Sequence, residues 1–232
     1  MSDLKVARRE LKYRLDAVTA RLLRDRVSRV LPVDRPGPPD GYLVRSLYFD
    51  TPWDKDFHDK IDGLEVRHKI RLRIYGPGDT KVKLEEKSKR GTNQWKTSAT
   101  ITREQAELMR AGQYQTALAN HPSPFVQHLL RDMTINCYRP KIIVEFRRLA
   151  FTHGANQTRI TFDSHLTATE ANLDLFTTTP HYHPIMTGTV LEVKYDRFLL
   201  SHIKQTLDLA DRQTVSVSKY CLGRQTTLTG DR

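Results

Sequence analysis

Basic side chains alternate with apolar ones along residues 66–75, which read Val-Arg-His-Lys-Ile-Arg-Leu-Arg-Ile-Tyr. Because successive side chains of a strand point to opposite faces, Arg67, Lys69, Arg71 and Arg73 would share one face. A row of fixed cations is suited to holding an anion, although an ordinary solvated strand shows the same alternation. Taken alone, the pattern leaves both interpretations open.

The following stretch repeats this alternation after Gly76-Pro77-Gly78-Asp79, which predicts a hairpin turn. The alternating charged residues of this stretch are Lys81, Lys83, Glu85, Lys87 and Lys89. Residues 67–90 contain nine Lys and Arg against three Asp and Glu. Such a density repels itself unless solvent, carboxylates or a bound polyanion offsets it. We therefore interpret the two strands as a binding surface for a polyanion.

Three Glu-x-Lys triplets lie on separate predicted strands: Glu10-Leu11-Lys12, Glu85-Glu86-Lys87 and Glu192-Val193-Lys194. The spacing of two puts each Glu and Lys on one strand face, where Lys can bind an anion and Glu can hold a bridging divalent cation. Glu192, Glu85 and Glu10 are thus candidate ligands for a divalent cation. Cross-strand ion pairing is the alternative interpretation of the triplets.

Composition favours an anionic partner and a single domain. The chain has 232 residues and a formal net charge of +11, which suits nucleic acid, an acidic membrane surface, nucleotides or polyphosphate. Its length allows one substantial core, so we expect one domain over residues 1–232, with about 224–232 as a disordered tail. Two cysteines and no long apolar run lead us to expect a soluble cytoplasmic protein.

Hydrophobic periodicity predicts many strands and a few helices. Strands are expected at 8–15, 43–49, 66–75, 81–89, 95–101, 141–151, 159–163, 188–195 and 214–218. Helices are expected at 16–31, 102–110, 124–131 and 199–209, the second opened by a capping box at Thr102. Charged inner faces and apolar outer faces in this α+β pattern suit a barrel with a wet interior and helices outside.

Short motifs in this order resemble the polyphosphate polymerase (VTC-type) domain of the triphosphate tunnel metalloenzymes, also called CYTH-like. The matching pieces are Lys12-Tyr13, Ser46-Leu47-Tyr48-Phe49-Asp50-Thr51, Lys60-Ile61-Asp62-Gly63, Lys69-Ile70-Arg71-Leu72-Arg73-Ile74-Tyr75, Glu86-Lys87 with Lys96, Arg148-Leu149-Ala150-Phe151, Arg159-Ile160-Thr161-Phe162-Asp163, Leu191-Glu192-Val193-Lys194 and Ser218-Lys219-Tyr220. Each piece is short, but the ordered set spans nearly the whole chain.

The resemblance implies an antiparallel eight-stranded tunnel barrel whose charged lumen binds a triphosphate and passes the γ-phosphoryl group of ATP to a growing polyphosphate chain, releasing ADP. Carried over by position, the residues expected at the reacting phosphates are Lys12, Arg71, Arg73, Lys87, Arg148 and Arg159. Those expected to bind substrate more generally are Arg67, Lys69, Lys83, Lys96, Lys194 and Lys219. Glu192 is the implied ligand of Mn²⁺ or Mg²⁺. Arg147 and Arg148 cannot share a face without a bulge, and alternation does not choose between them.

One departure bears on the reaction. Hydrolytic tunnel enzymes generally begin with Glu-x-Glu-x-Lys, whereas this chain has Arg8 at the first Glu position. Losing that carboxylate weakens a water-activating metal site and favours the polymerase. A tripolyphosphatase or nucleoside triphosphatase and a non-catalytic polyphosphate-binding module stay open as alternatives.

Among partners, ATP and polyphosphate are expected and nucleic acid is not, because the basic strands offer few aromatic side chains for base stacking. The family resemblance suggests a membrane-embedded partner and a peripheral place at the membrane. The oligomeric state cannot be read from the sequence.

Overall fold

The computed structural model describes residues 8–34, 38–91, 93–207 and 213–229. Strands are β1 (Arg8–Leu15), β2 (Tyr42–Asp50), β3 (Val66–Ile74), β4 (Lys81–Arg90), β5 (Asn93–Thr102), β6 (Arg139–His153), β7 (Thr158–Thr169), β8 (His183–Pro184) and β9 (Thr189–Asp196). Helices are α1 (Ala17–Ser28), α2 (Lys55–Ile61), α3 (Arg103–Arg110), α4 (Tyr114–Leu118), α5 (Pro124–Ile135), α6 (Ser201–Leu207) and α7 (Lys219–Thr229), with a 3₁₀ turn η1 (Ala155–Gln157). The α+β class is confirmed.

The strands form a nine-stranded sheet of order β1-β9-β7-β6-β2-β3-β4-β5, with β8 paired to β7 beside this path. The registers of β1 with β9, β7 with β9, β2 with β3, β3 with β4 and β4 with β5 are all antiparallel. The sheet thus has nine strands, whereas an eight-stranded barrel was expected; the short β8 is the strand outside the eight-strand path. Closure of the sheet into a barrel stays a prediction.

Contacts divide the chain into two compact units. The first comprises Met1–Leu43, Phe146–Leu166 and Met186–Val217, and the second comprises Val44–Glu145, Thr167–Ile185 and Ser218–Arg232. The prediction that the chain is a single domain stays a prediction. Each unit is described by itself below.

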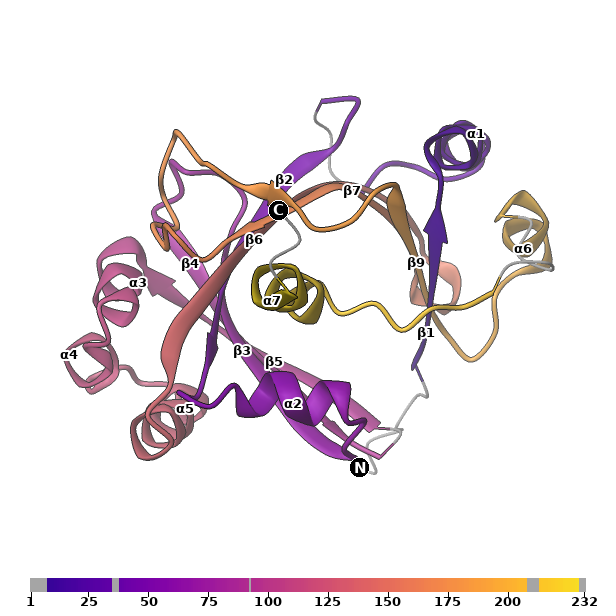
Figure 1. Cartoon of the computed structure of the whole chain (residues 1–232). Coiled ribbons are helices and arrows are strands. Elements are labelled where there is room, and N and C mark those ends of the chain that lie inside the picture. Colours follow the sequence, from indigo (N-terminus) through magenta and orange to yellow (C-terminus); the bar gives the residue numbers. More distant parts are fainter. Residues whose placement is uncertain (1–7, 35–37, 92, 208–212, 230–232) are drawn as a thin grey trace, which may run out of the picture. The chain divides into compact units, whose positions relative to one another are not determined.

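The core of the second unit lies on the apolar face of β3, β4 and β5. Ile70 and Leu72 from β3 and Leu84 from β4 pack with side chains of α3, α4 and α5, including Met109 and Leu129. Helix α3 begins at the predicted capping box, in which the Thr102 hydroxyl accepts a hydrogen bond from the Gln105 amide. Helix α7 lies on the opposite, polar face of these strands (Figure 1), where Lys69 donates to Ser218.

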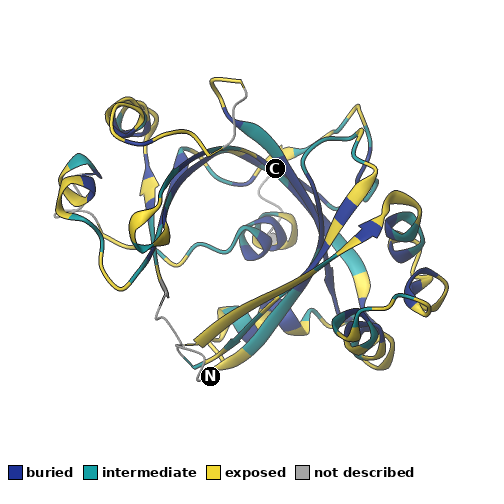
Figure 2. Cartoon of the chain, turned by 180° about the vertical axis from the view of Figure 1, so that it is seen from behind, coloured by how far each residue is buried: buried dark blue, intermediate teal, exposed yellow. Residues whose placement is uncertain are grey.

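The core of the first unit lies on the apolar face of β1, β9 and β7. Phe162 and Leu191 pack there with Leu23 and Val27 of α1 and with Ile203 of α6. Asp16 caps α1, because its carboxylate accepts the amide hydrogen of Thr19 at 2.9 Å. In both units the buried sides of the helices face a sheet, whereas much of β5 is exposed (Figure 2). Charged side chains are therefore left for the other strand faces.

The C-terminal part of the chain differs from two sequence predictions. Residues 214–218 form no strand; their backbone approaches β1 through a bond from Val215 N to Lys12 O of 2.8 Å. Residues 224–229, expected in a disordered tail, belong to helix α7, and 230–232 lie outside the described residues. The β-branched Thr214, Val215 and Val217 favoured a strand locally, but the backbone there is not paired into a ladder. Among the described residues, no helix is long and apolar enough to cross a membrane.

Candidate functional site

A charged face in the second unit follows from the register of β3, β4 and β5. Lys69, Lys87 and Lys96 lie opposite one another on the three strands. The other rows of this face are Arg67 with Lys89 and Gln94, Arg71 with Glu85 and Ser98, and Arg73 with Lys83 and Thr100. We call this set the cationic face. The alternation seen in the sequence therefore does bring the predicted cations of β3 and β4 to one side.

Glu85 is the single carboxylate in these rows, and it organises the cations around it. Arg71 Nε lies 2.8 Å and Arg73 Nη2 3.5 Å from Glu85 Oε2, while Lys96 pairs with the other oxygen. Burial acts to raise the pKa of Glu85, but Arg71, Arg73 and Lys96 outweigh it and lower the pKa to about 2. The carboxylate stays ionised and fixes the two arginines.

Tyr48 of β2 is a second partner of Arg71 that the sequence did not single out. Arg71 Nη1 donates to the Tyr48 hydroxyl at 2.9 Å, and the Tyr48 ring stacks on Tyr220 of α7 with centroids 5.2 Å apart. Burial acts to raise the pKa of Tyr48, but Arg71 and Arg73 lower it overall. A locked phenol and a fixed carboxylate together preorganise the Arg71 guanidinium.

Helix α7 is anchored on this face by polar contacts. Tyr220 donates to Asp50 Oδ2 at 2.5 Å, and Asp50 in turn accepts the amide hydrogens of Asp56 and Phe57 at the start of α2. Lys69 Nζ lies 2.5 Å from Ser218 Oγ, and burial lowers the pKa of Lys69. Asp50 thereby links α2 and α7 to the strands that carry the cations.

The remaining predicted cations of this unit lie nearer to solvent. Arg67 donates to the Leu64 carbonyl and Lys83 to the Thr100 hydroxyl. Lys87 is exposed, and Lys96 is exposed although it pairs with Glu85. Lys219, expected on a strand, is instead the first residue of α7 and is half-buried. The substrate contacts expected of these residues stay predictions.

A charged face in the first unit is built from β1, β9 and β7. Lys12 lies opposite Glu192, Glu10 opposite Lys194, and Lys194 opposite Arg159. Lys12 Nζ lies 3.0 Å from Glu10, and Lys194 Nζ lies 2.5 Å from Glu192 and 3.6 Å from Glu10. We call this set the paired face. Two of the predicted Glu-x-Lys triplets are therefore in contact with each other.

Burial and neighbouring charges act in opposite directions on Lys12. Burial would lower its pKa, but the carboxylates of Glu10 and Glu192 raise it overall. The ammonium group also donates to the Val217 carbonyl at 3.1 Å. Lys12 is thus a protonated cation held between two acids.

Arg148, and not Arg147, belongs to the ionic network of this unit. Its Nε atom donates to Asp163 Oδ1 and its Nη2 atom to Asp163 Oδ2, both at 2.7 Å, and Asp163 is fully buried. Burial would lower the pKa of Arg148, but Asp163 raises it. Arg147 is exposed. Arg159 pairs with Asp34 at 2.6 Å, so both predicted arginines of this unit already hold a carboxylate.

Glu192 and its neighbours are the candidate oxygen ligands for a divalent metal. The Thr161 hydroxyl lies on the neighbouring strand, buried and without a hydrogen-bond partner among the described residues. Within that part of the chain, no three His, Cys, Asp or Glu side chains form a metal-binding group by themselves. Mg²⁺ is commonly held by one or two carboxylates plus substrate phosphates. Glu192, Glu10 and Thr161 fit a metal that arrives with phosphates, whereas Glu85 is surrounded by cations.

Tyr48, Thr161 and Ser218 are the site residues that the sequence prediction missed. A signal existed for the first two, since Ser46, Tyr48 and Asp50 alternate with Leu47 and Phe49, and Thr161 stands between Arg159 and Asp163. Ser218 had no comparable signal, because its contact with Lys69 depends on where α7 lies.

Comparisons with known proteins agree with the motif order. The model of the VTC domain family matches residues 7–228. A comparison with curated protein sequences found no match.

Solved structures share the fold. A candidate adenylate cyclase from Bacillus halodurans superposes with a TM-score of 0.52 at 16% identity, covering 90% of this chain and 92% of that one. A candidate adenylate cyclase from Vibrio parahaemolyticus gives a TM-score of 0.50 at 16% identity, covering 93% and 97%. At these identities the likeness concerns the fold alone.

Proposed function

The chain belongs to the VTC domain family, and from this premise we propose that it is a polyphosphate polymerase. The reaction would transfer the γ-phosphoryl group of ATP to the end of an inorganic polyphosphate chain and release ADP. The family membership supports a reaction on polyphosphate or a triphosphate. That the reaction is polymer synthesis is our more specific inference, and it comes from the residues.

The cationic face is the observation that carries the proposal. Across three hydrogen-bonded strands it places eight Lys and Arg side chains around one carboxylate, Glu85. Glu85 and solvent offset part of their mutual repulsion, and a bound polyanion would offset more of it. Polyphosphate carries negative charges at regular intervals. The cationic face carries its positive charges in successive rows across β3, β4 and β5, so the two charge patterns are complementary.

Phosphoryl transfer asks little covalent chemistry of the protein. A terminal oxygen of the acceptor polyphosphate would attack the γ-phosphorus of ATP, and the bond from that phosphorus to the β,γ-bridging oxygen would break, leaving ADP. The protein contributes positioning and charge stabilisation. Arg71 and Arg73 suit that task, because Glu85 and Tyr48 hold Arg71 before substrate arrives.

A divalent cation is implied by the family and fits the paired face. Glu192, Glu10 and the Thr161 hydroxyl would hold it, assisted by phosphate oxygens. When bound, the metal would neutralise charge on the phosphates. Lys12 pairs with Glu10 and Lys194 pairs with Glu192. A bound metal would take over the neutralisation of these carboxylates, and the two ammonium groups could then turn to phosphate oxygens.

The sequence around β1 favours transfer to phosphate over transfer to water. Arg8 stands where the hydrolytic relatives generally carry a metal-binding Glu. One carboxylate fewer weakens activation of a metal-bound water, whereas an added cation favours an anionic acceptor.

The test is incubation of the chain with ATP and Mn²⁺, followed by a gel stained for polyphosphate and by assays of ADP and free phosphate. We expect a stained ladder, removed by an exopolyphosphatase, and ADP in excess of free phosphate. Arg71→Ala/Arg73→Ala should abolish the ladder, while Arg110→Ala on the surface of α3 should not. Free phosphate equal to ADP, without polymer, would identify a hydrolase and overturn the proposal. No ATP turnover, with polyphosphate still bound, would leave a binding module.

A further inference from the structure

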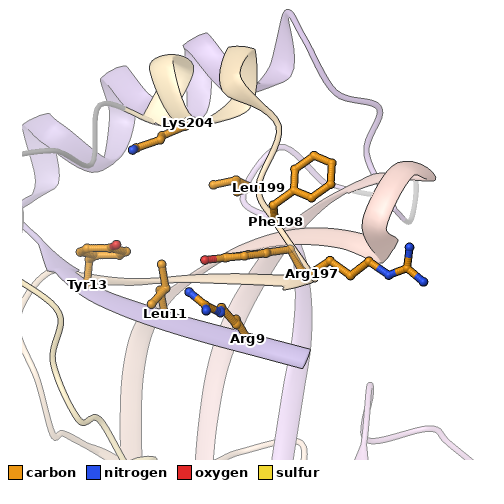
Figure 3. A pocket seen from close by; sticks show the side chains of 8 residues that line it. Arg9, Leu11, Tyr13, Arg197, Phe198, Leu199 and Lys204 are labelled. Carbon is orange, nitrogen blue, oxygen red and sulfur yellow. The ribbon is translucent and has the colours of Figure 1, made fainter. Parts of the chain in front are cut away.

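A cavity of about 420 Å³ opens in the first unit. It is lined by Arg9, Leu11, Tyr13, Tyr195, Arg197, Phe198, Leu199 and Lys204. Its floor is the apolar face of β1 and β9, and its far wall is the segment that leads into α6 (Figure 3). Its volume lies in the range of small-molecule sites.

Strand alternation separates this cavity from the paired face. Leu11 and Tyr13 point to the side of β1 opposite Glu10 and Lys12, and Tyr195 points to the side of β9 opposite Lys194. A ligand in the cavity would therefore not touch the carboxylates or lysines of that face.

Two mostly buried tyrosines line the cavity. Tyr13 is 4% exposed and Tyr195 is 7% exposed. Neither hydroxyl is fully buried, and within the described part of the chain neither makes a hydrogen bond to the protein. Both hydroxyls are therefore open to water or to a ligand. Burial and the neighbouring Tyr195 raise the pKa of Tyr13, so its hydroxyl stays protonated and able to donate.

The three basic residues of the lining, Arg9, Arg197 and Lys204, are exposed at the cavity mouth. Within the described ranges they form no ion pair and no side-chain hydrogen bond, and none of the eight lining residues is acidic. Figure 3 shows Lys204 reaching from α6 above the strand that carries Tyr13, Leu11 and Arg9, whereas the Arg197 guanidinium is directed away from them. Arg9 and Lys204 are thus the cations placed to meet a ligand.

We propose that this cavity binds a phosphate ester attached to an apolar body. The phosphate would lie between Arg9 and Lys204 and accept hydrogen bonds from Tyr13 and Tyr195. Leu11 and Leu199 would contact the apolar body. A bare inorganic anion would leave those apolar walls unused, and a neutral apolar molecule would leave the cations and phenols unused.

The probe is 1-naphthyl phosphate, titrated into the full chain by isothermal calorimetry. We expect it to bind at least 10-fold more tightly than either inorganic phosphate or 1-naphthol. Arg9→Gln/Lys204→Gln should weaken binding about 10-fold or more, because each charge-assisted contact is lost. Arg21→Gln/Arg29→Gln, which changes two exposed arginines near α1, is the matched control and should leave affinity unchanged.

Removing the Tyr13 and Tyr195 hydroxyls tests binding without disturbing the fold. Tyr13→Phe/Tyr195→Phe deletes two solvent-accessible hydroxyls that make no hydrogen bond within the described part of the chain, so thermal stability should be kept while affinity falls about 3- to 10-fold per hydroxyl. Tyr114→Phe, whose hydroxyl donates to the Tyr138 carbonyl at 2.7 Å, is the control that should lower stability without changing affinity.

Two results would overturn the site. One is unchanged affinity in both the Arg9/Lys204 and the Tyr13/Tyr195 variants. The other is loss of binding in Arg71→Ala/Arg73→Ala, which would place the probe on the cationic face. A phospholipid head group offers the same chemistry, so vesicles of phosphatidic acid form a second arm. Co-sedimentation that requires Arg9 and Lys204 would support the site and identify lipid as its source of phosphate.

Discussion

The two charged faces of this molecule use the same residue types in opposite ways. On the cationic face, Glu85 alone stands among eight cations spread over β3, β4 and β5. On the paired face and beside it, Lys12, Lys194, Arg148 and Arg159 each contact a carboxylate within about 3 Å. Charge is in excess on one face and nearly compensated on the other.

This difference separates binding from stability. Cations that exceed the carboxylates around them gain free energy when an anion arrives, so the cationic face is suited to a polyphosphate. Buried cations that are already paired have little to gain and much to lose if a partner is removed. Variants of the two faces should therefore fail in different assays.

The largest effect is expected from Arg71→Ala. Arginines that stabilise the transferring phosphoryl group contribute about 10³–10⁵-fold to the rate of phosphoryl transfer. We expect kcat for polymer synthesis to fall within that range and the thermal unfolding temperature to fall as well, because the buried Glu85 carboxylate loses one of its cationic partners. Steady-state release of ADP measures the rate.

Arg110→Ala serves as the control, because Arg110 pairs with Glu107 on an exposed helix surface of the same unit. A loss of less than threefold in Arg71→Ala would show that the cationic face only gathers polyphosphate. The catalytic charge would then have to be sought on the paired face.

Arg148→Met should act on stability first. It would leave the fully buried Asp163 carboxylate without its bidentate partner, at a cost of about 3–5 kcal/mol in the free energy of unfolding. Urea denaturation of the variant measures this loss. The adjacent Arg147→Met changes an exposed side chain and should cost less than about 0.5 kcal/mol. Equal stability of the two variants would contradict the assignment of Arg148 to a structural pair.

Much of the fold could be predicted, because the hydrophobic periodicity of strands and the capping residues of helices depend on residues close together in the sequence. Alternation predicted β1, β3, β4 and β9, and the capping box at Thr102 predicted the start of α3. Helix α7 was missed, because Val215 and Val217 just before it favour a strand while Gly223 within it weakens helix propensity. Its stability comes from tertiary contacts such as Tyr220 with Asp50 and Tyr48. A Cβ at Gly223 would lie 2.7 Å from Ile142 Cδ1, so that side chain would have to shift.

The candidate site was predictable in residue type and less so in pairing. Strand parity placed Arg71, Arg73 and Glu85 on one face, as the register has them. The alternation of side chains along a strand could not predict that Arg148 pairs with Asp163 or that Arg159 pairs with Asp34. These contacts depend on side-chain rotamers and on a loop that is distant in the sequence. The cavity beside Tyr13 and Tyr195 needed the position of the segment before α6 and had no sequence signal.

Glu85 ties stability to pH on the cationic face. Its folded pKa of about 2 lies below the ordinary value of 4.5, so it contributes stability above pH 4.5 that is lost as pH falls toward 2. The shift corresponds to about 3 kcal/mol at neutral pH. The difference in unfolding free energy between the wild type and Glu85→Gln should therefore shrink from pH 6 to pH 3. Glu107→Gln is the surface control, and a pH-independent difference would rule out this role.

Glu192→Gln should have the smallest effect, and it decides which face holds the metal. Removing the carboxylate beside the Thr161 hydroxyl should raise the half-saturating Mn²⁺ concentration about 10- to 100-fold. Loss of the free Mn²⁺ electron paramagnetic resonance signal in the presence of ADP measures binding without turnover. Glu85→Gln should leave that concentration unchanged while lowering kcat, because Glu85 holds arginines instead of a metal. If Glu85→Gln weakens Mn²⁺ binding and Glu192→Gln does not, the metal belongs to the cationic face.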